Sequence, residues 1–410
     1  MRAVWAPGEA ETVAQDFDLR RLPPKFYLDP YPVYRALREQ APIKSMPDGS
    51  LFLSRYDDLV AVYKDTATFS SDKREEFRPK YGDSPLYEHH TTSLVFNDPP
   101  LHTRVRKLIA GALTPRAIAD LAPDLEALVD QLLDTMEGRP QVDLIEDFAA
   151  RIPVEVIGNL LAVPHAARGP LRGWSLAILG ALEPAPTPQV LEAGNRAVEE
   201  MSGYLDGLIA LRRKAPGDPA RDVLTRLLAG EDGERLSARE LVHNCIFLLN
   251  AGHETTTNLI GNALATLDAW EGERRRLIAS PDLISTAVEE FLRFESSNQL
   301  GNRRATRETE LGGVTIAAGR FVTLGIGAAN RDPSQFPAPD RLDVGCTPNR
   351  HLAFAAGAHQ CAGLALARLE GRVAIGKFLA RYPAYALDGE PTLGGRARFR
   401  GHLRLPARLV

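Results

Sequence analysis

Residues 351–370 read HLAFAAGAHQCAGLALARLE, and this stretch decides the fold that we expect for the rest of the chain. It begins as a loop in which Gly357 can adopt a positive φ, and it ends as a series of strong helix formers. Cys361 stands at the junction, so we expect its sulfur at the N-terminus of a helix. The first N–H groups of a helix carry partial positive charge, which favours a thiolate that can bind a metal. Gly363 has no side chain and would let a flat ligand approach the backbone.

On residue type alone, the cysteine allows two other interpretations. A single cysteine is most often a small core residue. A zinc site built from Cys346, His351, His359 and Cys361 is also conceivable, but the chain has no C-x-x-C pair to support it. The order of the surrounding residues favours a third interpretation.

Residues 354–363 follow the pattern F-x-x-G-x-H-x-C-x-G, which resembles the haem-binding loop of the cytochromes P450. The proximal iron ligand of that family is a cysteine thiolate. The resemblance implies that Cys361 is the metal ligand and that Phe354, His359 and Gly363 contact the haem. The residue after the phenylalanine is a departure, because the family usually has glycine where this chain has alanine.

The composition fits one large domain that stays in water. The chain has 410 residues, 44% of them hydrophobic, so a large core can form. The net charge of −4 gives no basic footprint for nucleic acid, and no apolar run reaches the roughly 18 residues that would span a membrane. Three cysteines are too few for a disulfide framework and, with no apolar leader segment, predict a cytoplasmic protein. We expect a monomer, with an N-terminal tail over residues 1–28 and a single domain over 29–410.

The order of the predicted elements indicates a mainly α fold with small β-sheets, divided into a small β-rich lobe and a large helical lobe. Residues 73–95 are predicted to form a long irregular loop. Prolines interrupt the later helices at 183–188. Helical patterns cover residues 29–40, 57–64, 117–161 and 165–215, and strand or hairpin patterns cover 51–53 and 305–332.

The longest predicted helix covers residues 237–269 and starts with the capping box S-A-R-E. At 1.5 Å per residue it is roughly 45–50 Å long, so it must cross the whole domain. Its middle reads A-G-H-E-T-T over 251–256, where the glycine and the threonines weaken a helix locally. Two interpretations stay open: a packing notch with threonines bonded back to carbonyls, or an opened segment that seats a small polar ligand.

The A-G-x-E-T-T pattern also resembles the acid–alcohol pair of the cytochromes P450. The resemblance implies that the haem lies between this long helix and the helix that follows Cys361, with Ala251 against it. It further implies that Thr255 donates a hydrogen bond to dioxygen and that Glu254 relays protons from solvent. Cleavage of the O–O bond needs two protons, and they must reach the oxygen without letting bulk water into the pocket.

Two further motifs carry charged groups. His102 and Arg106 lie four residues apart on one helix face, where two donors can grip one carboxylate. A solvated basic face is the simpler interpretation of that spacing. However, the sequence D-P-P-L-H-T-R-V-R resembles the family helix whose histidine and arginine bind a haem propionate. Arg303 matches the arginine on the side of the second propionate, with His359 assisting.

Glu290 and Arg293 form an E-x-x-R pair, whose charges can meet on one helix. The pattern is common by chance, but its position between the long helix and the cysteine loop matches the family. The resemblance implies that a third cation, Arg341 in the segment P-D-R-L, joins the pair and fixes the loop behind the haem. We expect these three residues to be structural.

The resemblance also suggests which residues line a substrate pocket. Arg398 or Arg400 would favour an acidic substrate if either guanidinium faced that pocket. The expected pocket residues are Thr92, Leu94, Val95, Ile178, Phe247, Asn250, Leu300 and Phe399.

The implied function is that of a haem-thiolate monooxygenase containing haem b (iron protoporphyrin IX). It would insert one oxygen atom from O₂ into a small organic substrate, by hydroxylation or O-dealkylation. No flavin or iron–sulfur sequence is visible, so electrons from NAD(P)H would arrive through a separate ferredoxin reductase and ferredoxin. Two alternatives are a haem protein that senses ligands without turnover and a peroxide-driven hydroxylase. The Glu254–Thr255 pair argues against both, because neither needs a proton relay.

Overall fold

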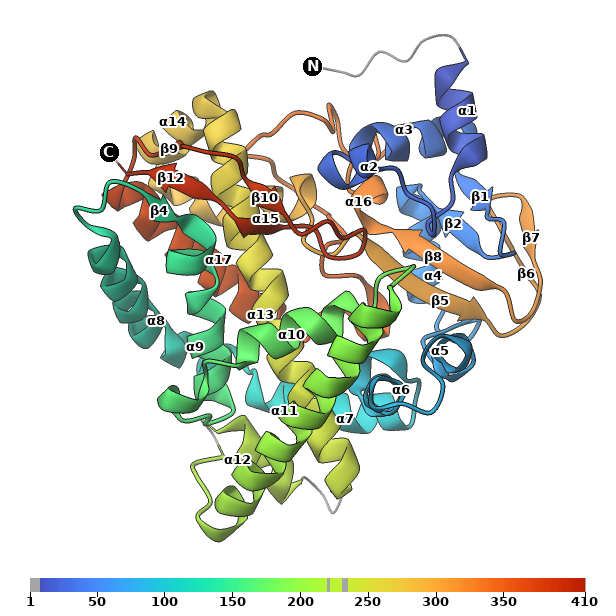
Figure 1. The fold of residues 1–410 in the computed structure, drawn as a ribbon. Coiled ribbons are helices and arrows are strands. Elements are labelled where there is room, and N and C mark those ends of the chain that lie inside the picture. Colours follow the sequence, from blue (N-terminus) through green and yellow to red (C-terminus); the bar gives the residue numbers. More distant parts are fainter. Residues whose placement is uncertain (1–7, 220–221, 231–234, 410) are drawn as a thin grey trace.

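The computed structural model describes residues 8–219, 222–230 and 235–409. These residues form a mainly helical structure with small sheets, in which a β-rich lobe lies beside a larger helical lobe (Figure 1). The helices are α1 (Glu9–Asp16), α2 (Pro24–Leu28), α3 (Tyr31–Gln40), α4 (Tyr56–Lys64), α5 (Arg74–Tyr81), α6 (Pro85–Thr92), α7 (Leu101–Ala112), α8 (Pro115–Met136), α9 (Arg151–Leu160), α10 (Leu171–Gly180), α11 (Pro188–Lys214), α12 (Val223–Ala229), α13 (Ala238–Ala269), α14 (Glu271–Ala279), α15 (Ile284–Phe294), α16 (Ile326–Ala329) and α17 (Leu364–Arg381). The strands are β1 (Ile43–Ser45), β2 (Leu51–Leu53), β3 (Phe69–Ser70), β4 (Val142–Asp143), β5 (Leu300–Ala305), β6 (Thr309–Leu311), β7 (Val314–Ile316), β8 (Phe321–Gly325), β9 (Ala386–Leu387), β10 (Thr392–Leu393), β11 (His402–Arg404) and β12 (Pro406–Arg408).

The β-rich lobe is built on a five-stranded sheet with the order β1-β2-β8-β5-β3. Only the β2–β8 pair is parallel in this sheet, and β5 pairs with β8 from Leu300 opposite Gly325 to Arg304 opposite Phe321. Helices α1 to α3 lie on one side of it (Figure 1). A cluster of buried residues, among them the aromatic rings of Phe17, Phe26, Tyr34 and Phe52, packs these helices against β2. The predicted strand over 51–53 is confirmed, and β6 and β7 form an antiparallel hairpin inside the predicted region 305–332. The end of that region differs from the prediction, because residues after β8 form the short helix α16.

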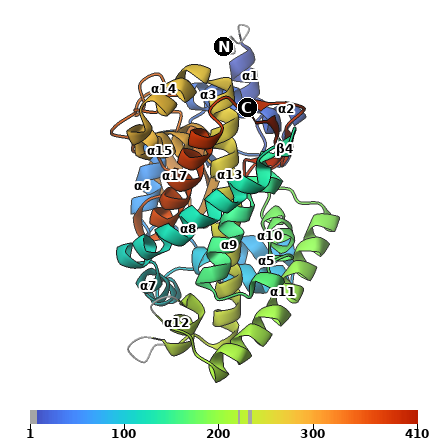
Figure 2. The same cartoon turned by 90° about the vertical axis from the view of Figure 1, so that its left-hand side faces the viewer.

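Helix α13 runs through the middle of the helical lobe and contacts α9, α10, α11, α15 and α17 (Figures 1 and 2). Its 32 residues correspond to about 48 Å at 1.5 Å per residue. The capping box is present: Ser237 accepts a hydrogen bond from the N–H of Glu240, and the Glu240 carboxylate accepts one from the N–H of Ser237. The predicted long helix is confirmed, with the expected start and end.

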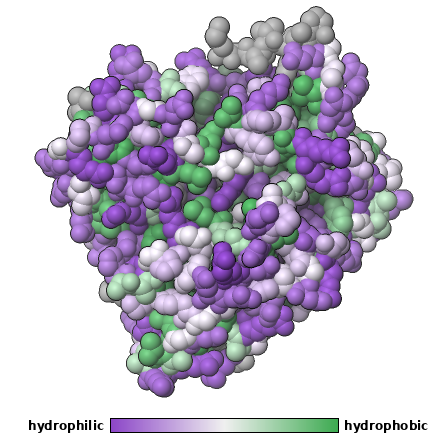
Figure 3. Space-filling model, in the orientation of Figure 1, coloured by the Kyte–Doolittle hydropathy of each residue, from purple (hydrophilic) through white to green (hydrophobic). Residues whose placement is uncertain are grey.

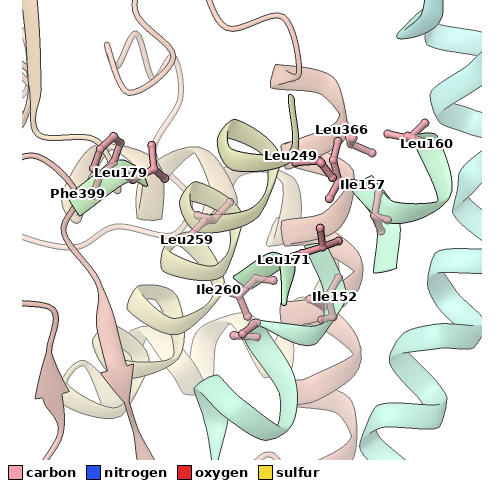
Figure 4. Close-up of a cluster of buried hydrophobic side chains, with 14 of the residues drawn as sticks. Ile152, Ile157, Leu160, Leu171, Leu179, Leu249, Leu259, Ile260, Leu366 and Phe399 are labelled. Atoms are coloured by element: carbon pink, nitrogen blue, oxygen red, sulfur yellow. The ribbon is translucent and has the colours of Figure 1, made fainter. Parts of the chain in front are cut away.

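The hydrophobic core of the helical lobe surrounds α13 on most sides. Burial of this apolar surface contributes the larger part of the driving force for packing the helices together. Figure 4 shows one part of that core, with Ile152, Ile157 and Leu160 of α9, Leu171 and Leu179 of α10, Leu249, Leu259 and Ile260 of α13, Leu366 of α17, and Phe399 near the C-terminus.

The prediction of a long irregular loop over residues 73–95 is wrong, because the segment forms α5 and α6. Helix α6 starts in the ordinary way, with Ser84 as N-cap accepting from the N–H of Tyr87 and Pro85 at the first helical position. Phe77 of α5 and Leu86 of α6 are buried in the core of the helical lobe. Burial of these few apolar residues in the folded protein stabilises two short helices. The many charged residues around them obscure the apolar pattern from which the helices could have been predicted.

The tail predicted over residues 1–28 is folded from Glu9 onward. Its residues form α1 and α2, and Ala14, Phe17 and Phe26 are buried with residues of α3 and β2. The predicted boundary at residue 29 therefore does not separate a folded part from an unfolded one. Residues 1–7 of this prediction lie outside the described residues.

The visible face of the molecule is covered mainly by polar residues, with apolar ones scattered among them (Figure 3). Within the part of the chain that the structure describes, no helix combines the length and the apolar character needed to cross a membrane.

Candidate active site

The cysteine loop is held in one shape by its backbone. The N–H of Cys361 donates to the carbonyl of Phe354 (2.9 Å), and Ala355, at φ +55°, donates to the carbonyl of Leu352 (2.8 Å). Gly357 has φ +70°, and a Cβ there would lie 2.3 Å from the backbone oxygen of Tyr63, so only glycine fits. Helix α17 begins at Leu364, two residues later than the helical pattern predicts.

Cys361 is exposed as a residue, whereas Cys245 is completely buried in the core. Burial of the surrounding site raises the pKa of the Cys361 thiol, while the N–H of Gly363 and the charges of Arg106 and Arg368 lower it. A Cβ added to Gly363 would meet nothing within 4 Å, so open space lies over this part of the backbone. Cys361 is thus not a core residue.

The zinc alternative has no support in the geometry. Among the residues that the structure describes, no group of three or more histidine, cysteine, aspartate or glutamate side chains could hold a metal ion. His351 instead lies 3.3 Å from the carboxylate of Glu289, which also accepts two hydrogen bonds from Arg368 (2.7 Å each).

One face of α13 also keeps accessible surface in its middle. Phe247, Ala251 and Thr255 are spaced four residues apart, so they lie on the same face, and each is only partly buried. Leu248 and Gly252 on the neighbouring face are also partly buried, and the other residues of this helix segment are buried. Partly exposed side chains at the centre of a long core helix, like those of the cysteine loop, indicate internal space beside them.

The middle of α13 is a continuous helix, so the opened segment considered above is not present. Thr255 Oγ1 donates to the carbonyl of Ala251 (2.7 Å), and Thr257 Oγ1 donates to that of His253 (3.0 Å). A Cβ on Gly252 would lie 3.2 Å from Ile157 Cδ1 on α9, which makes the glycine a packing notch. The threonine hydroxyls are therefore accommodated here without a break in the helix.

Glu254 is buried, and among the described residues it forms an ion pair with one cation, Arg396. Its Oε1 lies 3.4 Å from Arg396 Nη1 and accepts a weak hydrogen bond from Asn258 Nδ2, also at 3.4 Å. Burial raises the pKa of the Glu254 carboxyl, and Arg396, Asn258 and Arg172 lower it. A carboxyl in such surroundings can change its protonation state more readily near neutral pH than an exposed one.

Two arginines and two histidines gather where α7, β5 and the cysteine loop meet: Arg106, Arg303, His102 and His359. The rings of His102 and His359 lie 4.0 Å apart between centroids, and His102 Nε2 is buried without a hydrogen-bond partner. Burial lowers the pKa of His359 to about 2, and Arg303, His102 and Arg106 lower it further. Burial also lowers the pKa of His102, with Arg106 adding to the effect.

Arg303 in this cluster is buried without a carboxylate partner. Its Nη1 donates to the carbonyl of Asn302 (2.7 Å), and its guanidinium lies 5.4 Å from the ring centre of Tyr63. Within the described ranges, no salt bridge is present for Arg303 or His102. A buried charge without a partner is costly, so this cluster fits an anionic group that completes it.

The predicted E-x-x-R pair is a buried, two-point salt bridge. Arg293 Nε and Nη2 each lie 2.7 Å from a carboxylate oxygen of Glu290. The glutamate also accepts from the N–H of Asp343 (3.0 Å) and from Asn349 Nδ2 (2.9 Å). The arginine donates to the carbonyls of Asn330, Pro339 and Arg341 (2.9–3.2 Å).

The prediction that Arg341 adds a third cation to this pair is wrong. Its side chain is exposed, and only its backbone carbonyl contacts Arg293. Asn349 takes the place expected for the cation, because a neutral amide can satisfy the remaining oxygen without bringing another charge into the core. The pair therefore fixes residues 330–349, the segment that leads into the cysteine loop.

The expected pocket residues divide into two groups. Leu94, Ile178, Asn250, Leu300 and Phe399 are buried in the structure, whereas Thr92, Val95 and Phe247 keep some accessible surface. The amide oxygen of Asn250 accepts a hydrogen bond from Ser175 on α10 (2.8 Å), so this side chain joins two helices.

Neither arginine proposed to select an acidic substrate has a free guanidinium. Arg398 donates to the carbonyls of Leu182 (3.2 Å) and Leu300 (2.9 Å), and also bonds Asn302. Arg400 bonds the carboxylate of Glu295 and donates to two backbone carbonyls near α2. Arg396, which contacts Glu254, is not predicted from the sequence; no local motif marks it, because the two residues are 142 positions apart.

The chain resembles known proteins over most of its length. The sequence model of the family Cytochrome P450 matches residues 181–268 and 278–391. The Vitamin D(3) 25-hydroxylase of Pseudonocardia autotrophica is 40% identical over 368 residues, which cover 88% of each chain. The 6-deoxyerythronolide B hydroxylase of Saccharopolyspora erythraea is 34% identical over 398 residues, 94% of this chain and 97% of that protein.

A solved structure gives the same result for the fold. P450BioI, in complex with an acyl carrier protein ligated to hexadec-9Z-enoic acid, matches with a TM-score of 0.89 and 35% sequence identity. The match covers 94% of this chain and 100% of that one. With the accessible cysteine, the matching family pattern and relatives of this similarity, the chain belongs to the cytochrome P450 family and is a haem-iron monooxygenase.

Proposed function

We propose that this monooxygenase binds haem b between α13 and Cys361 and inserts one oxygen atom of O₂ into a small organic substrate, by hydroxylation or O-dealkylation. The observation that carries the proposal is the exposed residue Cys361 beside open backbone at Gly363, close to the paired rings of His102 and His359 and to the buried Arg303, which forms no salt bridge among the described residues.

The residues of the chain fit this cofactor in three ways. The Cys361 sulfur would ligate the iron. His102, Arg106, Arg303 and His359 would hold the two propionate carboxylates, which supply the negative charge missing from their cluster. Ala251 and Thr255 on the partly exposed face of α13 would lie over the opposite side of the ring. When bound, the haem supplies the chemistry of oxygen activation.

The protein itself would supply positioning and protons. The hydroxyl of Thr255 already donates to the carbonyl of Ala251, and it can turn toward a ligand because a hydroxyl rotates freely. Glu254, one residue away, is buried beside a single close cation and is suited to hold or release one proton. An intact pair of this kind favours a monooxygenase over a ligand sensor or a peroxide-driven enzyme.

The electron donors belong to the same proposal. We expect NAD(P)H as the source, with a separate ferredoxin reductase and ferredoxin as carriers. The substrate can be identified through its binding to the ferric protein. A compound library screened for spectral shifts of the ferric protein identifies candidates directly.

The reduced protein bound to carbon monoxide tests the cofactor and its ligand. The absorption band should be strongly shifted to the red, as a thiolate ligand produces. Cys361→Ser should lose this band, whereas Cys346→Ser, which changes another partly exposed cysteine, should keep it. A thiolate band that survives in Cys361→Ser, or that is absent from the wild type, contradicts the proposal. Turnover with a surrogate ferredoxin and reductase then separates an oxygenase from a sensor.

A further inference from the structure

Helix α10 is joined to α13 by two polar links, and one of them passes through the C-terminal segment. In the direct link, Ser175 Oγ donates to Asn250 Oδ1 (2.8 Å), and both side chains are buried. In the indirect link, Arg396 Nη2 donates to the carbonyl of Leu176 (2.9 Å), while Nη1 lies 3.4 Å from Glu254 Oε1.

These residues close a ring. Asn250 and Glu254 lie one turn apart on α13, and Ser175 and Leu176 are neighbours on α10. Arg396 is the only member that belongs to neither helix, since it follows β10 in the C-terminal segment. The same guanidinium thus contacts a backbone carbonyl of one helix and the carboxylate of the other.

The residues after Arg396 hold the connection between α10 and α11. The N–H groups of Ala397 and Arg398 donate to the carboxylate of Glu183 (2.7 and 3.1 Å), and Arg398 Nε donates to the carbonyl of Leu182 (3.2 Å). The position of the Arg396 backbone therefore depends on where this connection lies.

The charges around Glu254 make the contact with Arg396 important. The glutamate is buried, and Arg396 is the nearest cation; Arg172, on α10, acts from farther away. Asn258, from α13 itself, offers a neutral donor at 3.4 Å. Removing Arg396 from this position would therefore favour the neutral form of the carboxyl.

We propose that Arg396 is a positioning residue that links the docking of α10 on α13 to the charge of Glu254. With α10 docked, the carbonyl of Leu176 holds the guanidinium against the carboxylate and favours its ionised form. When α10 moves away, Arg396 loses this anchor, and the carboxyl takes up a proton from solvent. Docking then releases that proton again, at the moment when the helix covers the site. The inference rests on the proposed function only for the use of this proton in turnover.

Hydrogen exchange of backbone amides over residues 171–182 in the ferric protein tests the link to α10. Arg396→Gln should raise exchange in this segment several-fold, because both contacts weaken. Glu254→Gln should raise it too, although no hydrogen bond or ion pair joins Glu254 to α10, because the arginine loses its ionic partner. In the double variant, exchange should rise no further than in Arg396→Gln alone. Arg396→Lys, which keeps the charge but cannot hold both partners at once, should fall between the wild type and Arg396→Gln.

Arg404→Gln is the matched control, since it removes an arginine that lies 3.3 Å from a carboxylate, that of Asp143, in the same C-terminal region. It should leave exchange over 171–182 unchanged. Unchanged exchange in Glu254→Gln overturns the proposal, because Arg396 would then anchor α10 independently of Glu254. The carbon monoxide spectrum is recorded for every variant; loss of the thiolate band in the wild type would contradict the proposed function without affecting the exchange result.

A pH profile tests the link to the charge of Glu254. The fraction of consumed electrons that appears in product, rather than in peroxide, is measured from acidic to alkaline pH. The pH at which this fraction is half-changed is attributed to Glu254. In Arg396→Gln this midpoint should move to higher pH, because the nearest cation among the described residues is gone, and Arg396→Lys should restore it in part. In Glu254→Gln that midpoint should vanish. A profile that does not move in Arg396→Gln overturns the proposal.

Discussion

The rings of His102 and His359 lie 4.0 Å apart and inclined by 39°, although the two residues come from α7 and from the cysteine loop, 257 positions later. With Arg106 and Arg303 nearby, both imidazoles have a lowered pKa and are neutral at pH 7. No carboxylate of the described residues forms a salt bridge with either ring. Two regions of the chain thus meet at a place that is ready for an anion.

We expect His102→Phe to weaken haem retention. The variant keeps the ring volume but removes a donor to a carboxylate, a hydrogen bond that contributes roughly 1.5–3 kcal/mol. Transfer of haem to an excess of apomyoglobin should accelerate by roughly 10- to 100-fold. His165→Phe changes an exposed histidine elsewhere and should transfer haem at the wild-type rate. Equal rates for all three proteins would remove His102 from the binding of the cofactor.

We expect Thr255→Ala to divert electrons from product to peroxide. The variant removes the hydroxyl on the accessible face of α13, and the product-forming rate should fall by roughly 10-fold or more, as for other proton-transfer groups. Stability should change little, because Thr255 Oγ1 bonds only a carbonyl of its own helix. Product, peroxide and consumed NADPH are measured together.

Thr257→Ala serves as the comparison for this experiment. Thr257 makes the same bond to the carbonyl four residues earlier, but it is buried on another face of α13. Its variant should keep the wild-type ratio of product to peroxide. If Thr255→Ala also keeps that ratio, the hydroxyl takes no part in proton delivery.

We expect Arg293→Ala to destabilise the protein far more than Arg341→Ala. Removing Arg293 leaves the buried carboxylate of Glu290 without its cation, which costs roughly 3–5 kcal/mol. Arg341 contributes only its carbonyl to this site, and a substitution keeps that atom, so the change should stay within about 0.5 kcal/mol. Urea denaturation midpoints of the two variants measure the difference. A large loss in Arg341→Ala would mean that its side chain does join the pair in solution.

We expect Glu370 to lower the stability of the protein as pH rises from about 4.3 to about 8. This carboxyl lies in α17, fully buried, with Oε2 unpaired, and burial raises its pKa to about 8. The folded-state pKa is thus above the unfolded value of about 4.3, so stability is highest below pH 4.3 and declines as pH rises toward about 8.

Glu370→Gln should remove this decline. Relative to the wild type, the variant should gain up to roughly 4 kcal/mol at pH 8 and little at pH 4.5. Urea midpoints at the two pH values give the comparison. An equal change at both would show that Glu370 is ionised in the folded protein or paired there with a group not visible in the structure.

The sequence predicts the large elements well because their signals are local. The capping box at Ser237 and the lack of breaks give α13, and the helix formers after Gly363 give α17 to within two residues. Helices α5 and α6 are not predicted from the sequence. Their charged residues and Pro79 leave too few apolar side chains for a helical pattern to be recognised. Those side chains become stabilising only once the core of the helical lobe covers them.

The candidate site shows the same division. Spacing and family pattern indicate Cys361, His102 and Glu254, and the structure brings His102 beside His359; the roles of these residues stay predictions until tested. Pattern alone cannot tell which atom of a residue is used, as the carbonyl of Arg341 shows. It also cannot reveal a contact made only by the fold, and Arg396 is such a case.

The aromatic cluster near the N-terminus has a practical consequence for anyone who shortens this chain. The rings of Phe17 and Phe52 lie 5.0 Å apart, and those of Phe26 and Tyr34 lie 5.6 Å apart, all in the core beneath the five-stranded sheet. A truncated protein that begins at Asp29 would expose Tyr34 and Phe52 to water and leave an exposed hydrophobic surface on the β-rich lobe. Such a truncated protein would tend to aggregate, so affinity tags and fusion partners should be attached before Gly8.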